Sequence, residues 1–138
     1  MHNILNADLH CHSVVSDGTM TPEALAARAA ANGVELWALT DHDEVGGQHR
    51  AAAAARENGM RYLTGTEISV TFANETVHIV GLGFDPDDAA ISQGLYDTRG
   101  GRGKRAMEMS DGLAKVGIKV TLEPFPQDLP GRARRSWP

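Results

Sequence analysis

The chain lacks the features that mark several classes of protein. It has one cysteine, Cys11, among 138 residues, which excludes an internal disulfide framework and fits a reducing cytoplasm. No apolar run approaches the roughly 20 residues that span a membrane, and the polar residues 1–7 do not read as a signal peptide. The formal net charge of −5 argues against a protein that coats nucleic acid. We therefore expect a cytoplasmic globular protein.

The first half of the sequence predicts alternating strands and helices. Short strands are expected at residues 3–12, 34–40 and 61–63, and the apolar run 34–40 is typical of a buried parallel strand. A helix is expected to begin after the N-cap Thr21, with Pro22 at its first position, and to end at Gly33. An alanine-rich helix over residues 46–58 should end at Gly59 in the same way. This order is typical of a parallel α/β sheet or barrel.

A β-hairpin is predicted next, from alternating residues 67–72 and 75–84 around a two-residue turn at Ala73-Asn74. In that register Phe72 pairs with Glu75 and Ser69 pairs with His78. Glu67 then lies diagonally from His78 on the same face, about 7 Å away between Cα atoms. A slip of one residue would place His78 on the opposite face.

The remaining sequence predicts helix and then an irregular end. Residues 87–116 have a helical pattern interrupted by glycines, which predicts two helical pieces or one kinked helix, and residues 117–122 could form a strand. Residues 125–138 contain three prolines and three arginines without periodicity. This end is a solvated tail, or a truncated or out-of-frame remnant. We therefore predict one domain over residues 1–123 and an irregular tail over 124–138.

The stretch DLHCHSVVSDG places two histidines at alternate positions near the end of the first predicted strand. Residues i and i+2 of a strand face the same side, so His10 and His12 should point together and Cys11 away. Gly18 lets the backbone turn so that Asp17 faces back toward them. Alone, the pair would fit a surface or core position as well as a metal site. In parallel α/β folds, however, active sites gather at this end of the strands.

Other strand ends carry similar side chains. The second strand runs into Asp41-His42-Asp43, the third into Glu67, and the hairpin carries His78. The other two histidines, His2 and His49, are expected in solvent. Mixed histidine and carboxylate ligands suit Mn, Zn or Fe better than Ca or Mg alone. Such a site activates water and neutralises charge on a phosphoryl group.

Two roles are open for the charged residues near these candidate ligands. Asp41 and Asp43 either hold an imidazole by its other N–H group or are solvent-facing turn residues. The basic cluster around the glycines either is a solvated helix face or contacts phosphate near the site; it contains Arg99, Arg102, Lys104 and Arg105. Cys11 is expected to be a small buried residue and Trp37 a core residue.

Four ordered motifs, DLHCHSVVSDG, TDHD, GTEIS and HIVGLG, resemble the PHP (polymerase and histidinol phosphatase) family over about residues 5–118. The resemblance implies a distorted (β/α)7 barrel with up to three divalent metal ions. We expect Mn, with Zn, Fe or Mg as alternatives. The resemblance implies that Glu67 bridges metals and that the other ligands are His10, His12, Asp17, His42 and His78. The sequence looks most similar to stand-alone bacterial 3′,5′-nucleoside bisphosphate phosphatases and 5′-to-3′ exonucleases.

The family also has later ligands, a further histidine and an Asp-x-His pair, and an arginine segment that binds substrate phosphate. These have no counterpart in this sequence, in which no histidine follows His78. A closed barrel of this kind takes about 250 residues. We therefore expect an α/β fold that forms the N-terminal part of a PHP barrel, with weaker metal binding and slower hydrolysis than a complete enzyme. The expected function is metal-dependent phosphoester hydrolysis of a nucleotide or oligonucleotide. The alternatives are a histidinol-phosphate-type phosphatase and an inactive metal-binding fragment or interaction module.

Overall fold

The computed structural model describes residues 5–118, with backbone alone for residues 102, 103 and 105. Four strands form one sheet in the order β1-β2-β3-β4, in which the first three are parallel and β4 is antiparallel to β3. The strands are β1 (Ala7–Asp8), β2 (Leu36–Leu39), β3 (Arg61–Phe72) and β4 (Glu75–Leu82). The helices are α1 (Pro22–Ala31), α2 (Gln48–Glu57) and α3 (Ala89–Lys115). No helix in residues 5–118 is long and apolar enough to cross a membrane.

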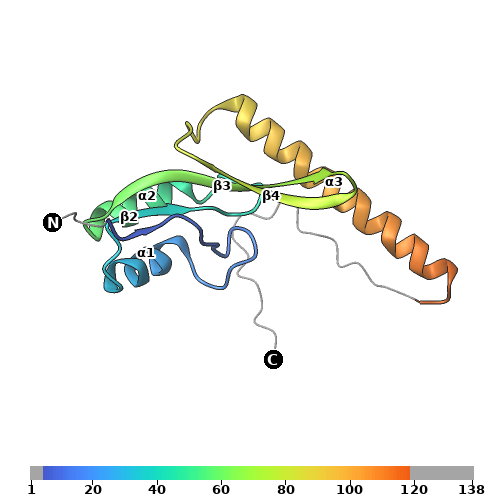
Figure 1. Ribbon diagram of the computed structural model, residues 1–138, viewed down its shortest axis with the longest axis horizontal. Coiled ribbons are helices and arrows are strands. Elements are labelled where there is room, and N and C mark those ends of the chain that lie inside the picture. Colours follow the sequence, from blue (N-terminus) through green and yellow to red (C-terminus); the bar gives the residue numbers. More distant parts are fainter. Residues whose placement is uncertain (1–4, 119–138) are drawn as a thin grey trace. The chain divides into compact units, whose positions relative to one another are not determined.

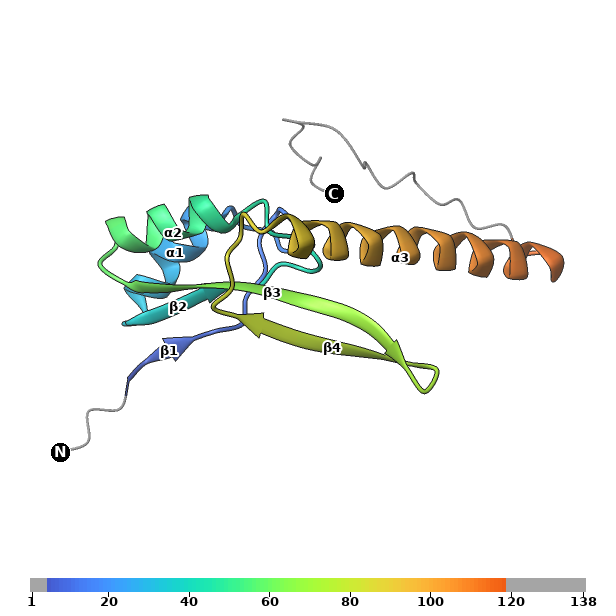
Figure 2. The ribbon, with the colours of Figure 1, turned by 90° about the horizontal axis from the view of Figure 1, so that it is seen from above.

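The chain divides after Arg99 into two compact units. In the first unit, α1 and α2 pack against each other and cover one face of the parallel strands (Figures 1 and 2). Small alanines on both helices allow this close packing, and the buried core includes Ala26, Ala51, Trp37, Leu39 and Met60. This arrangement confirms the predicted α/β class and the core position of Trp37. The second unit contains the part of α3 that follows Arg99.

The first strand is shorter than the predicted span of residues 3–12, because regular pairing stops after Asp8. At Cys11 the side chain of Thr40 takes the place of a backbone acceptor in the strand pairing. Cys11 N donates to Thr40 Oγ1 (3.1 Å), and Thr40 N donates to Cys11 O (2.9 Å). His10 and His12 therefore lie in irregular backbone, and the strand period does not set their directions.

The third predicted strand and the first hairpin strand are one element, β3, so Glu67 lies inside a strand and not beyond its end. Its first four residues pair with β2, up to Leu39 opposite Thr64, and the pairing with β4 begins at Gly65. A Cβ at Gly65 would lie 2.7 Å from Leu39 O. Glycine therefore permits the close approach at which β3 changes partner.

The predicted hairpin register is confirmed: Phe72 pairs with Glu75, and Ser69 pairs with His78. Ala73 and Asn74 both have positive φ, 50° and 65°, as a two-residue hairpin turn with matching twist requires. The side chain of His78 therefore shares a face with that of Glu67.

The helix boundaries follow the predicted signals. Thr21 Oγ1 accepts a hydrogen bond from Ala24 N (3.2 Å), and Gly33 follows α1 with a φ of 75°. The region predicted as two pieces or a kinked helix is one continuous helix, α3, whose first turn is capped by Asp88 Oδ1. Of the strand predicted over residues 117–122, only residues 117 and 118 are described, and neither is in a strand. The predicted tail lies outside the described residues.

Candidate metal centre

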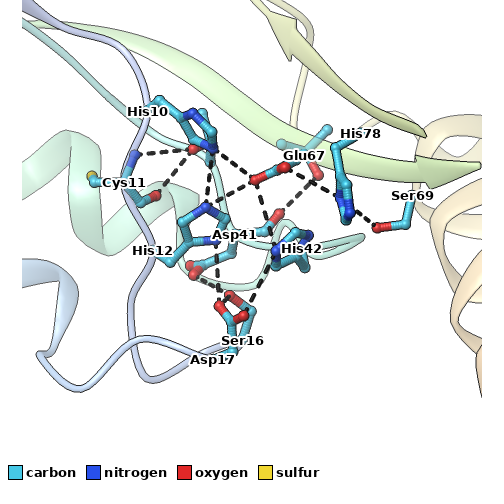
Figure 3. A network of polar contacts seen from close by, with 12 residues as sticks. His10, Cys11, His12, Ser16, Asp17, Asp41, His42, Glu67, Ser69 and His78 are labelled. Carbon is cyan, nitrogen blue, oxygen red and sulfur yellow. Dashed lines mark hydrogen bonds and ion pairs between the residues drawn. The ribbon is translucent and has the colours of Figure 1, made fainter. Parts of the chain in front are cut away.

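Glu67 is the centre of a cluster of four histidines (Figure 3). Its side chain is only 8% exposed. One carboxylate oxygen, Oε2, lies 2.7 Å from His10 Nε2 and 2.9 Å from His12 Nε2. The same oxygen lies 3.7 Å from His42 Nε2, and Oε1 lies 3.2 Å from His78 Nδ1. A single buried carboxylate thus faces imidazoles from three separate segments of the chain.

Two effects oppose each other at the Glu67 carboxyl. Burial raises its pKa, but the hydrogen bond from His10 and the nearby charge of His42, His10 and His12 outweigh burial. The pKa therefore lies below its usual value. The carboxylate is charged at neutral pH, as a metal ligand must be.

The Asp17 carboxylate also lies beside the cluster, next to His12 and His42. Its oxygens lie 3.4 Å from His12 Nδ1 and 3.6 Å from His42 Nε2. The described residues contain three groups of possible metal ligands, and within each group the ligand atoms lie within 4.8 Å of one another. The groups are His10, His12 and Glu67; His12, Asp17 and His42; and His42, Glu67 and His78. All six side chains predicted as metal ligands are therefore brought together.

The donor atoms of the cluster fit a bound cation, and two buried imidazole nitrogens beside them lack a hydrogen-bond partner in the part of the chain that the structure describes. His12 Nδ1 and His42 Nδ1 make no hydrogen bond among the described residues, and buried imidazole nitrogens normally find a partner. His12 Nδ1 faces an exposed carboxylate at a distance too long for a good hydrogen bond. Imidazole nitrogens and carboxylate oxygens together are the donor set of Mn, Zn and Fe sites.

Cys11 separates His10 from His12 and faces the other way, as predicted. Its Sγ donates to Ala38 O (3.4 Å), and its side chain packs half-buried against the core. Burial raises the pKa of the Cys11 thiol to about 11. The thiol is therefore protonated at neutral pH and anchors the segment that carries the two histidines.

Asp41 holds a loop, whereas the sequence predicted that it would hold an imidazole or face solvent. Its buried carboxylate accepts hydrogen bonds from Ser13 N (2.6 Å), Ser13 Oγ (2.7 Å) and Ser16 Oγ (2.6 Å). These contacts fix the loop between His12 and Asp17. Sequence reasoning did not identify either serine, because nothing in the pattern of residues places them against Asp41.

Asp43 is buried and sits in a tight turn after His42, with a φ of 47°. Its Oδ1 accepts a hydrogen bond from Ser69 N (2.9 Å), and its backbone N donates to Glu67 O (2.9 Å). The turn thus ties the end of β2 to β3. The Ser69 hydroxyl, also not predicted, lies 3.2 Å from His78 Nδ1 and helps to orient that ring.

The predicted basic cluster is described in part. The Arg99 guanidinium donates to Asp43 O (3.0 Å) and forms an ion pair with Glu44, close to the turn that carries His42. The side chains of Arg102 and Arg105 lie outside the described parts. His49 lies away from the cluster in an exposed pair with Asp87, as expected for a solvated residue, and His2 lies outside the described residues.

Comparison with known proteins places the chain in a family. The model for the PHP domain matches residues 8–113. The chain belongs to the PHP domain family. A 3′,5′-nucleoside bisphosphate phosphatase from Chromobacterium violaceum is 50% identical over 113 residues, and a 5′-3′ exoribonuclease from Haemophilus influenzae is 45% identical over 111 residues. These matches cover 82% and 80% of this chain, which spans about 40% of the length of each relative.

Solved structures have the same fold over this region. A Chromobacterium violaceum protein described as an amidohydrolase, with bound sulfate and no metal, is 50% identical and has a TM-score of 0.73. A Bifidobacterium adolescentis protein named as a candidate metal-dependent phosphoesterase is 36% identical and has a TM-score of 0.70. The matches cover 83% and 80% of this chain and 40% and 39% of those chains. The α/β unit is therefore part of a PHP barrel.

Proposed function

We propose that this chain provides the metal-binding part of a phosphoester hydrolase that acts on nucleotides or short oligonucleotides. The observation that carries the proposal is the Glu67 carboxylate, which is buried among four imidazoles with Asp17 beside them. The similarity to a nucleoside bisphosphate phosphatase and to an exoribonuclease supports this substrate class.

Divalent ions would be held by the three ligand groups, with Glu67 shared between two of them. When bound, they supply the positive charge that activates water and offsets the charge that develops on a phosphoryl group. We propose Mn first, and Zn, Fe or Mg as alternatives, from the mixture of nitrogen and oxygen donors. The half-buried, protonated Cys11 is compatible with the proposed cytoplasmic location.

The residues of the chain would hold and orient the reacting groups. Asp41 fixes the loop that bears His12 and Asp17, and the Asp43 turn fixes His42 against β3. Arg99 lies beside that turn, and we propose that it contacts a substrate phosphate. Phosphate contacts by Arg102 and Arg105 stay a prediction from the sequence.

The proposed reaction is release of phosphate from a nucleoside 3′,5′-bisphosphate, the substrate named for the Chromobacterium violaceum relative. The second candidate is 5′-3′ exoribonuclease activity, favoured by the Haemophilus influenzae relative. Phosphate release with Mn²⁺ should be compared between the wild-type chain and a His10→Ala, Glu67→Ala double variant. His49→Ala is a matched control, because this histidine is exposed and away from the cluster.

Turnover that the double variant loses and the control keeps would support the proposal. A short 5′-phosphorylated RNA in place of the bisphosphate separates the two candidate activities. Equal phosphate release by the wild type and the double variant would show that the cluster is not the catalytic site.

A further inference from the structure

Ser16 lies between two carboxylates with opposite surroundings (Figure 3). Its hydroxyl donates to Asp41 Oδ1 at 2.6 Å and lies 3.3 Å from Asp17 Oδ1. Asp41 is 1% exposed, whereas the Asp17 side chain is 66% exposed. Since a hydroxyl has one proton, the short bond to Asp41 takes it. Ser16 therefore attaches the loop to a buried group, immediately before the residue that faces the metal centre.

Asp41 is a fixed point to which the loop can be attached. Its carboxylate accepts two further hydrogen bonds from Ser13, and its backbone oxygen accepts from Glu67 N (3.1 Å) and Thr66 Oγ1 (3.2 Å). The same residue thus contacts the loop through its side chain and the strand that carries Glu67 through its backbone. Any group bonded to Asp41 is located relative to Glu67.

The Asp17 carboxylate, by contrast, has little to hold it. The backbone around it is tied by Ser16 N and Gly18 N, which both donate to Ser13 O. The carboxylate itself has only long contacts in the described structure, with His12, His42 and Ser16. An exposed side chain of this kind loses rotamer freedom when it binds an ion, and that loss weakens the binding.

We infer that Ser16 is a positioning residue for the Asp17 ligand. It acts through the hydrogen bond from its hydroxyl to Asp41 Oδ1, which holds the loop in place. This inference rests on the proposed function, since it assigns a role within the proposed metal centre. Removal of the hydroxyl should loosen the end of the loop next to Asp17 and shift its carboxylate, while Ser13 still holds the start of the loop to Asp41. His10 and Glu67 should keep their positions. Loss of a group that orients a metal ligand typically lowers metal affinity about 10–100-fold.

The test is a Mn²⁺ titration of the full chain, in which free Mn²⁺ is measured by its electron paramagnetic resonance signal. Ser16→Ala should weaken one class of bound Mn²⁺ by about tenfold and leave the remaining Mn²⁺ binding within about twofold of wild type. Ser16→Thr keeps the hydroxyl and should restore most of the lost affinity. Ser92→Ala on α3 is the matched control and should bind as wild type does.

A purely structural role would change a different quantity. Under the inference, the metal-free Ser16→Ala chain melts only a few degrees below wild type, because Asp41 Oδ1 keeps its hydrogen bond from Ser13 N. The Mn²⁺ isotherm then changes in one class of site and not in the others. Identical isotherms for wild type and Ser16→Ala, or an equal loss in every class together with a much lower metal-free melting temperature, would overturn the inference alone. Absence of Mn²⁺ binding by the wild type would instead overturn the metal centre itself, and the role of Ser16 with it.

Discussion

Replacement of Gln48 by leucine should strongly destabilise the fold. The side chain is 1% exposed, and its amide uses all four of its hydrogen-bonding positions. Nε2 donates to Leu39 O (3.0 Å) and Gly65 O (2.7 Å), while Oε1 accepts from Gly65 N (3.0 Å) and Tyr62 Oη (2.7 Å). Gln48 therefore joins α2 to β2 and β3 at the point where β3 changes its partner.

Leucine is similar in size but leaves these four partner groups without the amide. Each buried polar group left unpaired costs about 1–3 kcal/mol, and the added apolar burial returns about 1 kcal/mol. We expect Gln48→Leu to lower the free energy of unfolding by about 3 kcal/mol or more, a large share of a typical total of about 5–15 kcal/mol. Tyr62→Phe removes one of the four bonds and should cost about 1 kcal/mol.

Urea denaturation followed by far-ultraviolet circular dichroism measures these differences. The matched control is Gln93→Leu, an exposed position on α3, which should change stability by less than about 0.5 kcal/mol. If Gln48→Leu stays within about 1 kcal/mol of wild type, the amide does not hold the sheet and helix together, and the reasoning is wrong.

Three further changes test other parts of the account. Gly18→Ala should lower Mn²⁺ affinity at least tenfold, because the new Cβ would lie 2.1 Å from a backbone oxygen; unchanged titration would refute this. Replacing Ala73-Asn74 by Asn-Gly should raise the free energy of unfolding by about 1 kcal/mol, since both residues have positive φ; urea denaturation measures it. Arg50 holds the pKa of Glu23 near 2 by a hydrogen bond, so stability from this half-exposed pair is present above about pH 4.5 and lost toward pH 2. Arg50→Gln should lower the free energy of unfolding by less than about 1 kcal/mol at pH 7 and leave it unchanged near pH 2. Equal losses at both pH values would contradict this.

The parts of the fold that local residues determine could be predicted from the sequence. The two-residue turn at Ala73-Asn74 sets the hairpin register, which places His78 beside Glu67. Thr21 and Gly33 mark the ends of α1 because an N-cap hydroxyl and a left-handed glycine act on adjacent backbone. The family motifs likewise identified six side chains that meet in space.

Features that depend on contacts between distant segments could not be predicted. The Thr40 side chain takes the place of strand pairing at Cys11, so β1 ends early. The change of partner at Gly65 depends on how closely Leu39 approaches, which no local pattern shows. The serines that bind Asp41 are 25 or more residues from it in sequence. Periodicity and spacing carry no information about such pairs.

The most direct test of the metal centre is a crystal structure of the chain grown with Mn²⁺, with anomalous diffraction data to locate the ions. The account predicts Mn²⁺ coordinated by Glu67 together with His10 and His12, and further Mn²⁺ beside His42. Anomalous peaks only at exposed groups such as the His49–Asp87 pair, with Glu67 still hydrogen-bonded directly to His10, would contradict it.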